Sequence, residues 1–94
     1  MVRFERMKTG EKPIRLSQHA QEQARQRGAT EEDVRDAIRS AAWGPADAGR
    51  LECQKEFVCG RLWQGRSYQT KRVRPIFVDE PNEIVVVTVY VCYF

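Results

Sequence analysis

The chain has 94 residues, of which 41% are hydrophobic and 31% charged, and its formal net charge is +3. This length suffices for one small domain with one core and is too short for two. The composition excludes wholesale disorder, and no apolar run reaches the roughly 18 residues that a membrane helix needs. The N-terminal stretch MVRFERMKTGEKP has no apolar segment of the kind found in signal peptides. We therefore expect a cytoplasmic protein.

The N-terminal stretch is charged and contains Gly10 and Pro13. This composition predicts a charged arm over residues 1–13, followed by a single domain over residues 14–94. The chain contains no internal repeat and no low-complexity linker that would divide this domain further.

The first helix is expected over residues 18–27. Ser17 is a good N-cap, and Gly28 is a good residue to follow the last turn because glycine readily adopts a left-handed conformation. At about 100° per residue, one side of this helix gathers Leu16, Ala20, Ala24 and Arg27. An adjoining stripe holds His19, Gln23 and Gln26. The apolar face is narrow, so the helix must pack closely against its neighbour.

A second helix is expected over residues 31–42. Thr30 is its predicted cap, and three acidic residues follow in the first turn, where the helix dipole favours negative charge. Helical spacing places one apolar stripe toward the core, formed by Val34, Ala37, Ile38, Ala41 and Ala42. Trp43, Gly44 and Pro45 end the helix.

The remaining sequence predicts strands. Residues 51–59 alternate between apolar and polar, a second strand covers 66–78, and DEPNE at 79–83 forms a turn. Residues 84–93 are apolar on both faces and predict a central strand. Pro75 cannot donate to a ladder, which predicts a bulge or a strand break there. The fold class is α+β, with two N-terminal helices packed on one face of a mainly antiparallel sheet of three to four strands.

The three cysteines, Cys53, Cys59 and Cys92, form no CxxC pair. In a strand Cys53 and Cys59 would lie roughly 20 Å apart, which is too far for a disulfide. Their spacing relative to His19 supports no zinc motif. We expect buried free thiols, no metal site and no cofactor.

One stretch of the C-terminal half is basic. Between Phe57 and Val78 no acidic residue occurs, and two aromatic residues are interleaved with five cations: Arg61, Trp63, Arg66, Tyr68, Lys71, Arg72 and Arg74. Cations and aromatic rings together suit a polyanion with stackable bases, which predicts a nucleic-acid interface. The alternative is a solvated strand-and-loop surface that acidic residues elsewhere balance. The sequence leaves both open.

The segment HAQEQARQRGATEEDVRDAI resembles the opening pattern of a family of small bacterial domains of unknown function, His-Ala-x-Glu-Arg-x-x-x-Arg-Gly-Ile-x-x-x-x-Val-x-x-Ala. GRSY at 65–68, KRVRPIFVDE at 71–80 and VVTVY at 86–90 are similar to its later motifs, so the resemblance covers about residues 14–91. His19, Glu22, Arg27 and Gly28 match the pattern. Gln23 departs from it, because the family has arginine there.

That family in turn resembles, distantly, the RelE/ParE toxins and other metal-independent ribonucleases. The resemblance implies a RelE-like fold, RNA or the ribosome as the target, and a neutralising antitoxin-type protein as a partner.

Cleavage of RNA without a metal needs a base, an acid and cations that stabilise the transition state. Imidazole is a common acid or base in enzymes, so His19 could serve as either, and Arg27 could supply charge together with Lys71 or Arg72. Thr88 and Tyr90 share one face of the last strand and could bind a phosphate or position a base. We take His19, Arg27, Thr88 and Tyr90 as the candidate catalytic residues.

Each of these residues also has a structural alternative. A lone histidine can bond a strand carbonyl, the helix dipole favours Arg27, and Thr88 is a good strand former. Two functional hypotheses therefore remain. The first is an RNA-directed, toxin-like protein, either a metal-independent endoribonuclease or a relative that binds without cutting. The second is a non-catalytic protein-interaction module that docks through a sheet edge or through the loop at 60–66.

The first testable prediction concerns His19, which we expect on the helix face turned toward the sheet, near Thr88 and Tyr90. If His19 is catalytic, His19→Ala abolishes RNA cleavage with little change in melting temperature. If His19 is structural, the same change leaves a buried partner unsatisfied and costs ~1–3 kcal/mol of stability. An RNA cleavage assay and a thermal melt of both proteins distinguish the two outcomes.

Overall fold

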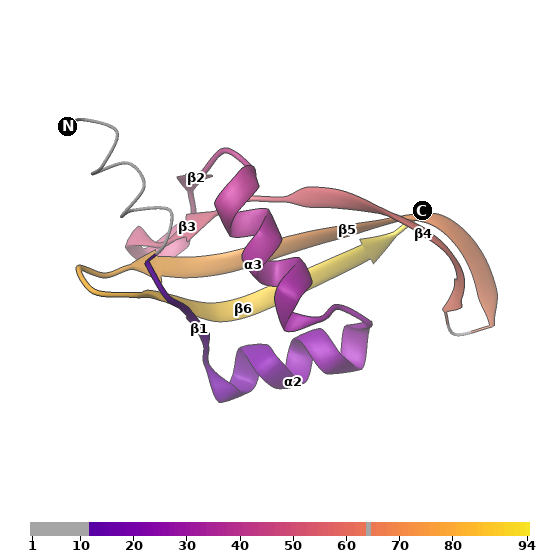
Figure 1. The fold of residues 1–94 in the computed structure, drawn as a ribbon, viewed down its shortest axis with the longest axis horizontal. Coiled ribbons are helices and arrows are strands. Elements are labelled where there is room, and N and C mark those ends of the chain that lie inside the picture. Colours follow the sequence, from indigo (N-terminus) through magenta and orange to yellow (C-terminus); the bar gives the residue numbers. More distant parts are fainter. Residues whose placement is uncertain (1–11, 64) are drawn as a thin grey trace.

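The computed structural model describes residues 12–63 and 65–94. Its elements, in chain order, are β1 (Ile14–Leu16), α2 (Gln18–Arg27), α3 (Glu31–Ser40), β2 (Gly44–Pro45), the 3-10 turn η1 (Asp47–Gly49), β3 (Leu51–Glu52), β4 (Lys55–Trp63), β5 (Arg66–Asp79) and β6 (Ile84–Tyr93) (Figure 1). The predicted arm over residues 1–13 lies almost wholly outside the described residues. No helix in the described part of the chain is long and apolar enough to cross a membrane.

The strands form one six-stranded sheet in the order β1-β6-β5-β3-β2, with β4 also paired to β5. β1 runs parallel to β6, and the other pairs are antiparallel. The α+β class is confirmed, whereas the expected three to four strands are corrected to six in a mixed sheet. β1, β2 and β3 have two or three residues each, too few to show a period in the sequence.

Both helices begin where their caps predict. The Ser17 hydroxyl accepts from the Ala20 N–H of α2, and Gly28 ends this helix with φ 86°. Thr30 and Asp33 form a reciprocal capping box at the start of α3. This helix ends at Ser40, two residues before the predicted end at Ala42, because Ala41 has an extended backbone.

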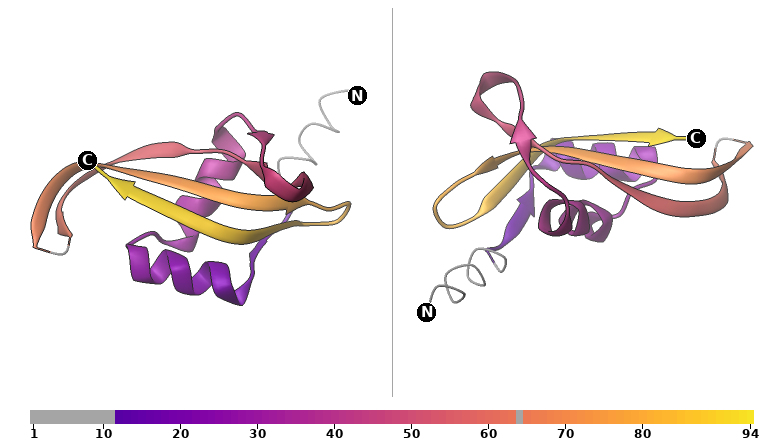
Figure 2. Two further views of the ribbon diagram at one scale, coloured as in Figure 1. Left: turned by 180° about the vertical axis from the view of Figure 1, so that it is seen from behind. Right: turned by 90° about the horizontal axis from the view of Figure 1, so that it is seen from above.

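The two helices do not form one equivalent layer. α3 crosses one face of the sheet over β5, and α2 lies alongside β6 (Figure 1). The connection that contains η1 lies on the face away from α3 (Figure 2). The expectation that both helices pack on one face is therefore not confirmed in that form. Within residues 12–63 and 65–94 the rest of that second face carries no helix, and we call it the open face.

A bulge in β6 decides which side chains reach the open face. Ile76 of β5 pairs with Thr88, whereas Phe77 pairs with Val86, so Val87 is an extra residue in β6. Val86 and Val89 are therefore both fully buried, although three positions separate them. Beyond the bulge the even-numbered residues of β6 face away from the core. The core itself comprises Ile14, Leu16, Ala20, Ala24, Ala29, Val34, Ala37, Ile38, Cys53, Val73, Phe77, Ile84, Val86 and Val89.

Pro75 is fully buried in the middle of β5, opposite Val89 of β6. On the other side of β5 the pairing stops at Glu52 and resumes at Lys55, so the ladder is interrupted opposite Pro75. Proline lacks an N–H and cannot continue that ladder. The irregularity predicted at Pro75 is found in the neighbours of β5, as the bulge at Val87 of β6 and the break between β3 and β4, whereas β5 itself is continuous through Pro75.

Lys71 forms a largely covered ion pair and a hydrogen bond that join β5 to the helices. Its ammonium lies 2.8 Å from the Asp33 carboxylate and donates to the Gly28 carbonyl at 3.0 Å. Both side chains of this ion pair are largely covered, at 13% and 20% exposure. The pair joins the start of α3 to β5. The assignment of Lys71 to a phosphate-binding surface is therefore corrected, because its charge is held on the helix side of the sheet.

The cysteines are free, as expected, but only Cys53 is buried; Cys59 is half-buried and Cys92 is exposed. Burial, together with the nearby Glu52 carboxylate, raises the pKa of the Cys53 thiol to about 11. This thiol donates to the Ala37 carbonyl and acts as a core residue.

The second prediction concerns stability at acid pH. Burial raises the pKa of Asp33, but hydrogen bonds from Lys71 and Thr30 outweigh burial and hold this pKa below its ordinary value of 3.8. A carboxyl group with a lowered folded-state pKa stabilises the fold above its unfolded pKa, and this contribution is lost as the pH falls through the folded value. Asp33→Asn should therefore lower the melting temperature near neutral pH by the equivalent of about 1.5–3 kcal/mol and flatten its fall below about pH 4.

Thermal melts between about pH 7 and about pH 3 measure this effect. Asp36→Asn is the matched control, since Asp36 pairs with Lys55 at a more exposed position of the same helix. An equal loss in both variants would contradict the role assigned to the Lys71–Asp33 pair.

Candidate functional site

Two arginines lie over aromatic rings on the open face. The guanidinium carbon of Arg74 lies 4.8 Å from the centre of the Tyr90 ring, and that of Arg72 lies 4.8 Å from the centre of the Phe94 ring. The two rings are 45% and 50% exposed. Large apolar side chains that stay this exposed on a sheet face offer a surface on which planar groups can stack.

A carboxylate fixes each of these arginines. Arg74 lies 2.7 Å from a Glu52 oxygen, and Arg72 lies 2.8 Å from a Glu56 oxygen. The open face thus carries the same arrangement twice. In each copy a glutamate holds an arginine of β5 over an exposed aromatic ring.

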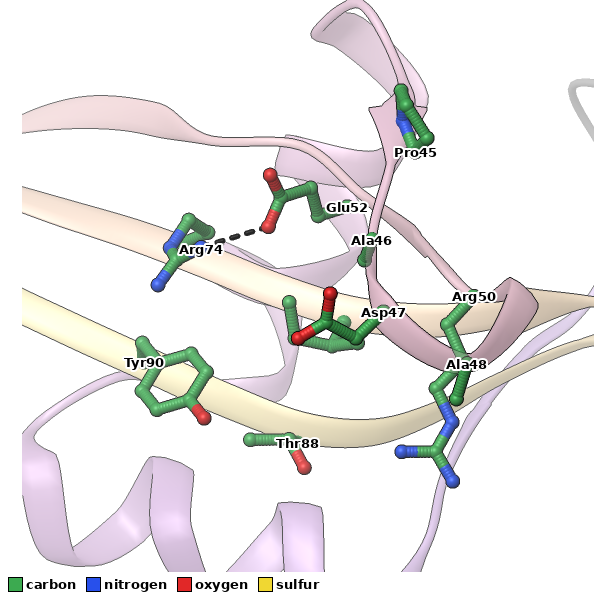
Figure 3. Close-up of a pocket in the computed structure, with 10 residues that line it drawn as sticks. Pro45, Ala46, Asp47, Ala48, Arg50, Glu52, Arg74, Thr88 and Tyr90 are labelled. Carbon is green, nitrogen blue, oxygen red and sulfur yellow. Dashed lines mark hydrogen bonds and ion pairs between the residues drawn. The ribbon is translucent and has the colours of Figure 1, made fainter.

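A hollow of about 680 Å³ opens next to Tyr90, between the η1 connection and strands β5 and β6. This volume is within the range of about 300–1,000 Å³ typical of small-molecule sites. Figure 3 shows its lining, which consists of Pro45, Ala46, Asp47, Ala48, Arg50, Glu52, Arg74, Ile76, Thr88 and Tyr90. Two acidic and two basic side chains are among these residues, so the formal charges of the lining balance.

Two side chains of α2 hold the strand that carries Tyr90. The Gln23 side-chain oxygen accepts from the Val89 N–H at 2.9 Å, and Arg27 donates to the Val89 carbonyl at 2.8 Å. These backbone groups point away from β5 and toward α2. β1 pairs with β6 only as far as Val86, so α2 satisfies the strand edge beyond that point. We call this arrangement the Val89 clamp.

The clamp also brings a second cation to the ring. The guanidinium carbon of Arg27 lies 5.8 Å from the centre of the Tyr90 ring, in addition to the closer Arg74. At the end of the helix, the Tyr93 hydroxyl donates to the Arg27 carbonyl at 2.6 Å. Arg27 is thus fixed at both its backbone and its side chain, next to the exposed tyrosine.

The predicted catalytic residues are only partly brought together. Thr88 and Tyr90 line the hollow, and Arg27 approaches Tyr90. His19 is exposed, and no hydrogen bond or ion pair joins it to another residue of the described ranges 12–63 and 65–94. No hydrogen bond or ion pair of the described residues thus joins His19 to Thr88 or Tyr90, and its position near them stays a prediction. The structural role that the sequence left open for His19 belongs to Gln23, one helical turn later.

Gln23 is the functional residue that sequence reasoning missed. It drew attention only because the family pattern has arginine there. The physical signal is its four-residue spacing from Arg27, which places an amide and a guanidinium on one stripe of α2. The glutamine amide has an oxygen that can accept a hydrogen bond from a backbone N–H. The arginine side chain has no acceptor.

The predicted basic stretch does not form one free cationic surface. Arg72 and Arg74 are paired with Glu56 and Glu52, and Lys71 is paired with Asp33. Tyr68 packs on Tyr93 with ring centres 5.4 Å apart, whereas Arg66 is exposed. The side chains of Arg61 and Trp63 lie outside the described part of the chain. The described residues contain no group of three or more His, Cys, Asp or Glu side chains that could hold a metal ion.

Comparison with known proteins gives one match. The model of a family described as Domain of unknown function (DUF4258) matches residues 16–91. This range includes both helices, the Val89 clamp and the hollow. No curated protein and no solved structure matches the chain. The family description carries no activity, so function has to be argued from the site.

The third prediction tests the Val89 clamp. Gln23→Ala removes the acceptor of a partly buried backbone N–H, so it should cost about 1–2 kcal/mol of unfolding free energy. Gln26→Ala is the matched control, because Gln26 is an exposed glutamine on the same helix and should change stability by less than about 0.5 kcal/mol. Urea denaturation of the three proteins measures both values, and equal stabilities of the two variants would refute the clamp.

Proposed function

Since this chain belongs to the family of DUF4258 domains, which has no assigned function, we propose that it binds single-stranded RNA on the open face of its sheet. The observation that carries the proposal is the Tyr90 ring, exposed on a sheet face with the guanidinium groups of Arg74 and Arg27 beside it. Proteins that bind single-stranded RNA commonly stack bases on aromatic rings of such faces and contact phosphates with neighbouring cations.

Tyr90 and Phe94 provide two stacking positions on one strand. Four residues separate them, which corresponds to roughly 13 Å along β6. Their arginine neighbours extend each position, because a planar guanidinium also stacks on a base. Glu52 and Glu56 keep these arginines in place, so little side-chain entropy is lost when a base binds.

The charge arrangement supports contacts with bases more than a broad electrostatic attraction to phosphates. Carboxylates pair with both Arg72 and Arg74, whereas Arg50 and Arg66 are exposed cations, among the described side chains, that could contact phosphates. Binding should accordingly weaken with salt only moderately. Each phosphate contact removed should reduce the log–log slope by about 0.7 for a single strand.

The same groups are those that cleavage without a metal would use. Arg27 and Arg74 would stabilise the charge of the transition state, and the Tyr90 hydroxyl would exchange a proton with the reacting oxygens. Incubation of the protein with total RNA, with and without a chelator, tests this toxin-like activity. Cleavage that persists with chelator and is absent in Tyr90→Phe supports a nuclease. Binding without cleavage restricts the function to RNA recognition.

The distant resemblance to RelE/ParE toxins adds an expected partner. A neutralising antitoxin-type protein would act by covering the open face, where Tyr90 and Phe94 are exposed. Competition between such a protein and RNA for this face is the corresponding expectation.

A protein-interaction module is the second candidate, and the outer edge of β4 favours it. β4 pairs only with β5, so within the described residues its other edge carries no strand, and Val58 on this strand is 95% exposed. An open strand edge can receive a strand of a partner protein. This function would be indifferent to changes at Tyr90, which separates it from RNA binding.

The fourth prediction compares two substitutions of Tyr90. Tyr90→Ala removes one stacking position and should weaken binding of single-stranded RNA by about 1–3 kcal/mol, or roughly 5- to 150-fold. Tyr90→Phe retains the ring and should bind within a few-fold of the parent protein. Fluorescence anisotropy with a labelled oligouridine measures the affinities at several salt concentrations.

Arg25→Ala is the matched charge control, since Arg25 is exposed on α2 and takes no part in the clamp. Its loss should change affinity only slightly. If Tyr90→Ala binds RNA as tightly as the parent protein, the open face is not the RNA site.

A further inference from the structure

The hollow beside Tyr90 contains a carboxylate that the fold does not use. Asp47 lines the hollow, and Figure 3 shows its carboxylate directed into it. Within residues 12–63 and 65–94 this side chain has no hydrogen-bond or ion-pair partner. Glu52, the other acid of the lining, is committed to Arg74. Among the described residues, the Asp47 carboxylate is thus an unpaired acceptor in the lining of the hollow. The exposed Tyr90 ring is part of the same lining.

The connection that carries Asp47 is held in shape. The Ala46 N–H donates to the Arg50 carbonyl at 2.8 Å, and the Arg50 N–H donates to the Asp47 carbonyl at 3.2 Å. Between them Ala48 has φ 61° and Gly49 has φ 74°. A left-handed conformation is uncommon for alanine, and such positions concentrate at binding sites. The turn therefore fixes the backbone position of Asp47, whose side chain is exposed beside the hollow.

We propose that this hollow is a guanine-selective base site, in which the base stacks on Tyr90 and Asp47 accepts two hydrogen bonds from its edge. The inference rests on the proposed RNA-binding function and assigns base selectivity to the same face.

The chemistry of the bases selects guanine. A carboxylate has two acceptor oxygens and no donor. Guanine presents two adjacent donors, N1–H and the 2-amino group, which match a carboxylate in a bidentate fashion. Adenine and cytosine present one amino group beside an acceptor nitrogen, which a carboxylate repels. Uracil presents a single N–H between two carbonyl oxygens.

The other charges of the hollow are compatible with this assignment. Arg50 is an exposed cation directly after the turn that carries Asp47, and it can meet the phosphate of the same nucleotide. The Thr88 hydroxyl can donate or accept and adapts to either the base or the ribose. A free carboxylate without these neighbours would repel the RNA backbone.

The test uses the full chain and four labelled oligouridines, each carrying one guanosine, inosine, adenosine or cytidine. Inosine retains N1–H but lacks the 2-amino group. The parent protein should bind the guanosine oligomer about tenfold or more tightly than the adenosine and cytidine oligomers, with inosine between them. Asp47→Asn should remove the guanosine preference. Glu22→Gln is the matched charge control, because Glu22 is an exposed carboxylate of α2 that does not line the hollow, and the preference should persist in it.

Circular dichroism and thermal melts establish that both variants are folded. If no oligomer binds, the proposed function fails, and the base site fails with it. If the oligomers bind with equal affinity, or if Asp47→Asn keeps the guanosine preference, RNA binding stands and the guanine site is overturned.

Discussion

The contact of α2 with the Val89 backbone is the interaction on which the open face depends. Val89, which pairs with the buried Pro75 of β5, turns its N–H and its carbonyl outward to an edge that β1 does not reach. Leaving two such groups unsatisfied would be costly, and Gln23 and Arg27 satisfy both. The helix therefore substitutes for a missing strand, and its arginine is brought beside Tyr90.

The bulge at Val87 determines which side chains of β6 reach the open face. Because one extra residue in β6 reverses the alternation, Val89 returns to the core while Thr88 and Tyr90 turn to the face without a helix. The buried proline, the bulge and the clamp lie within a few residues of one another. Together they place an exposed tyrosine on a strand that the helix keeps fixed, which is the arrangement that recognition of a planar ligand requires.

The charge pairs determine which cations remain available to a ligand. Lys71 is paired with Asp33, and Glu52 and Glu56 orient Arg74 and Arg72 on the open face. Three cations of the basic stretch are thus paired with carboxylates, and two of them, Arg72 and Arg74, lie over aromatic rings. Specificity on such a face comes from stacking and from free acceptors such as Asp47 more than from net charge.

The sequence by itself determined both helices, their caps and the α+β class, because these depend on residues within a few positions of one another. It also singled out Arg27, Thr88 and Tyr90 as candidate site residues, and it predicted an irregular strand pairing at Pro75. Only the tertiary structure decided that His19 is exposed, that Gln23 binds Val89, and that the sheet has six strands. The physical reason is that β1, β2 and β3 are too short to show a period, and that ion pairs and strand edges join residues far apart in the chain. The charge of Lys71 could be counted in the sequence, but its partner Asp33 becomes a neighbour only through the packing of α3 on β5.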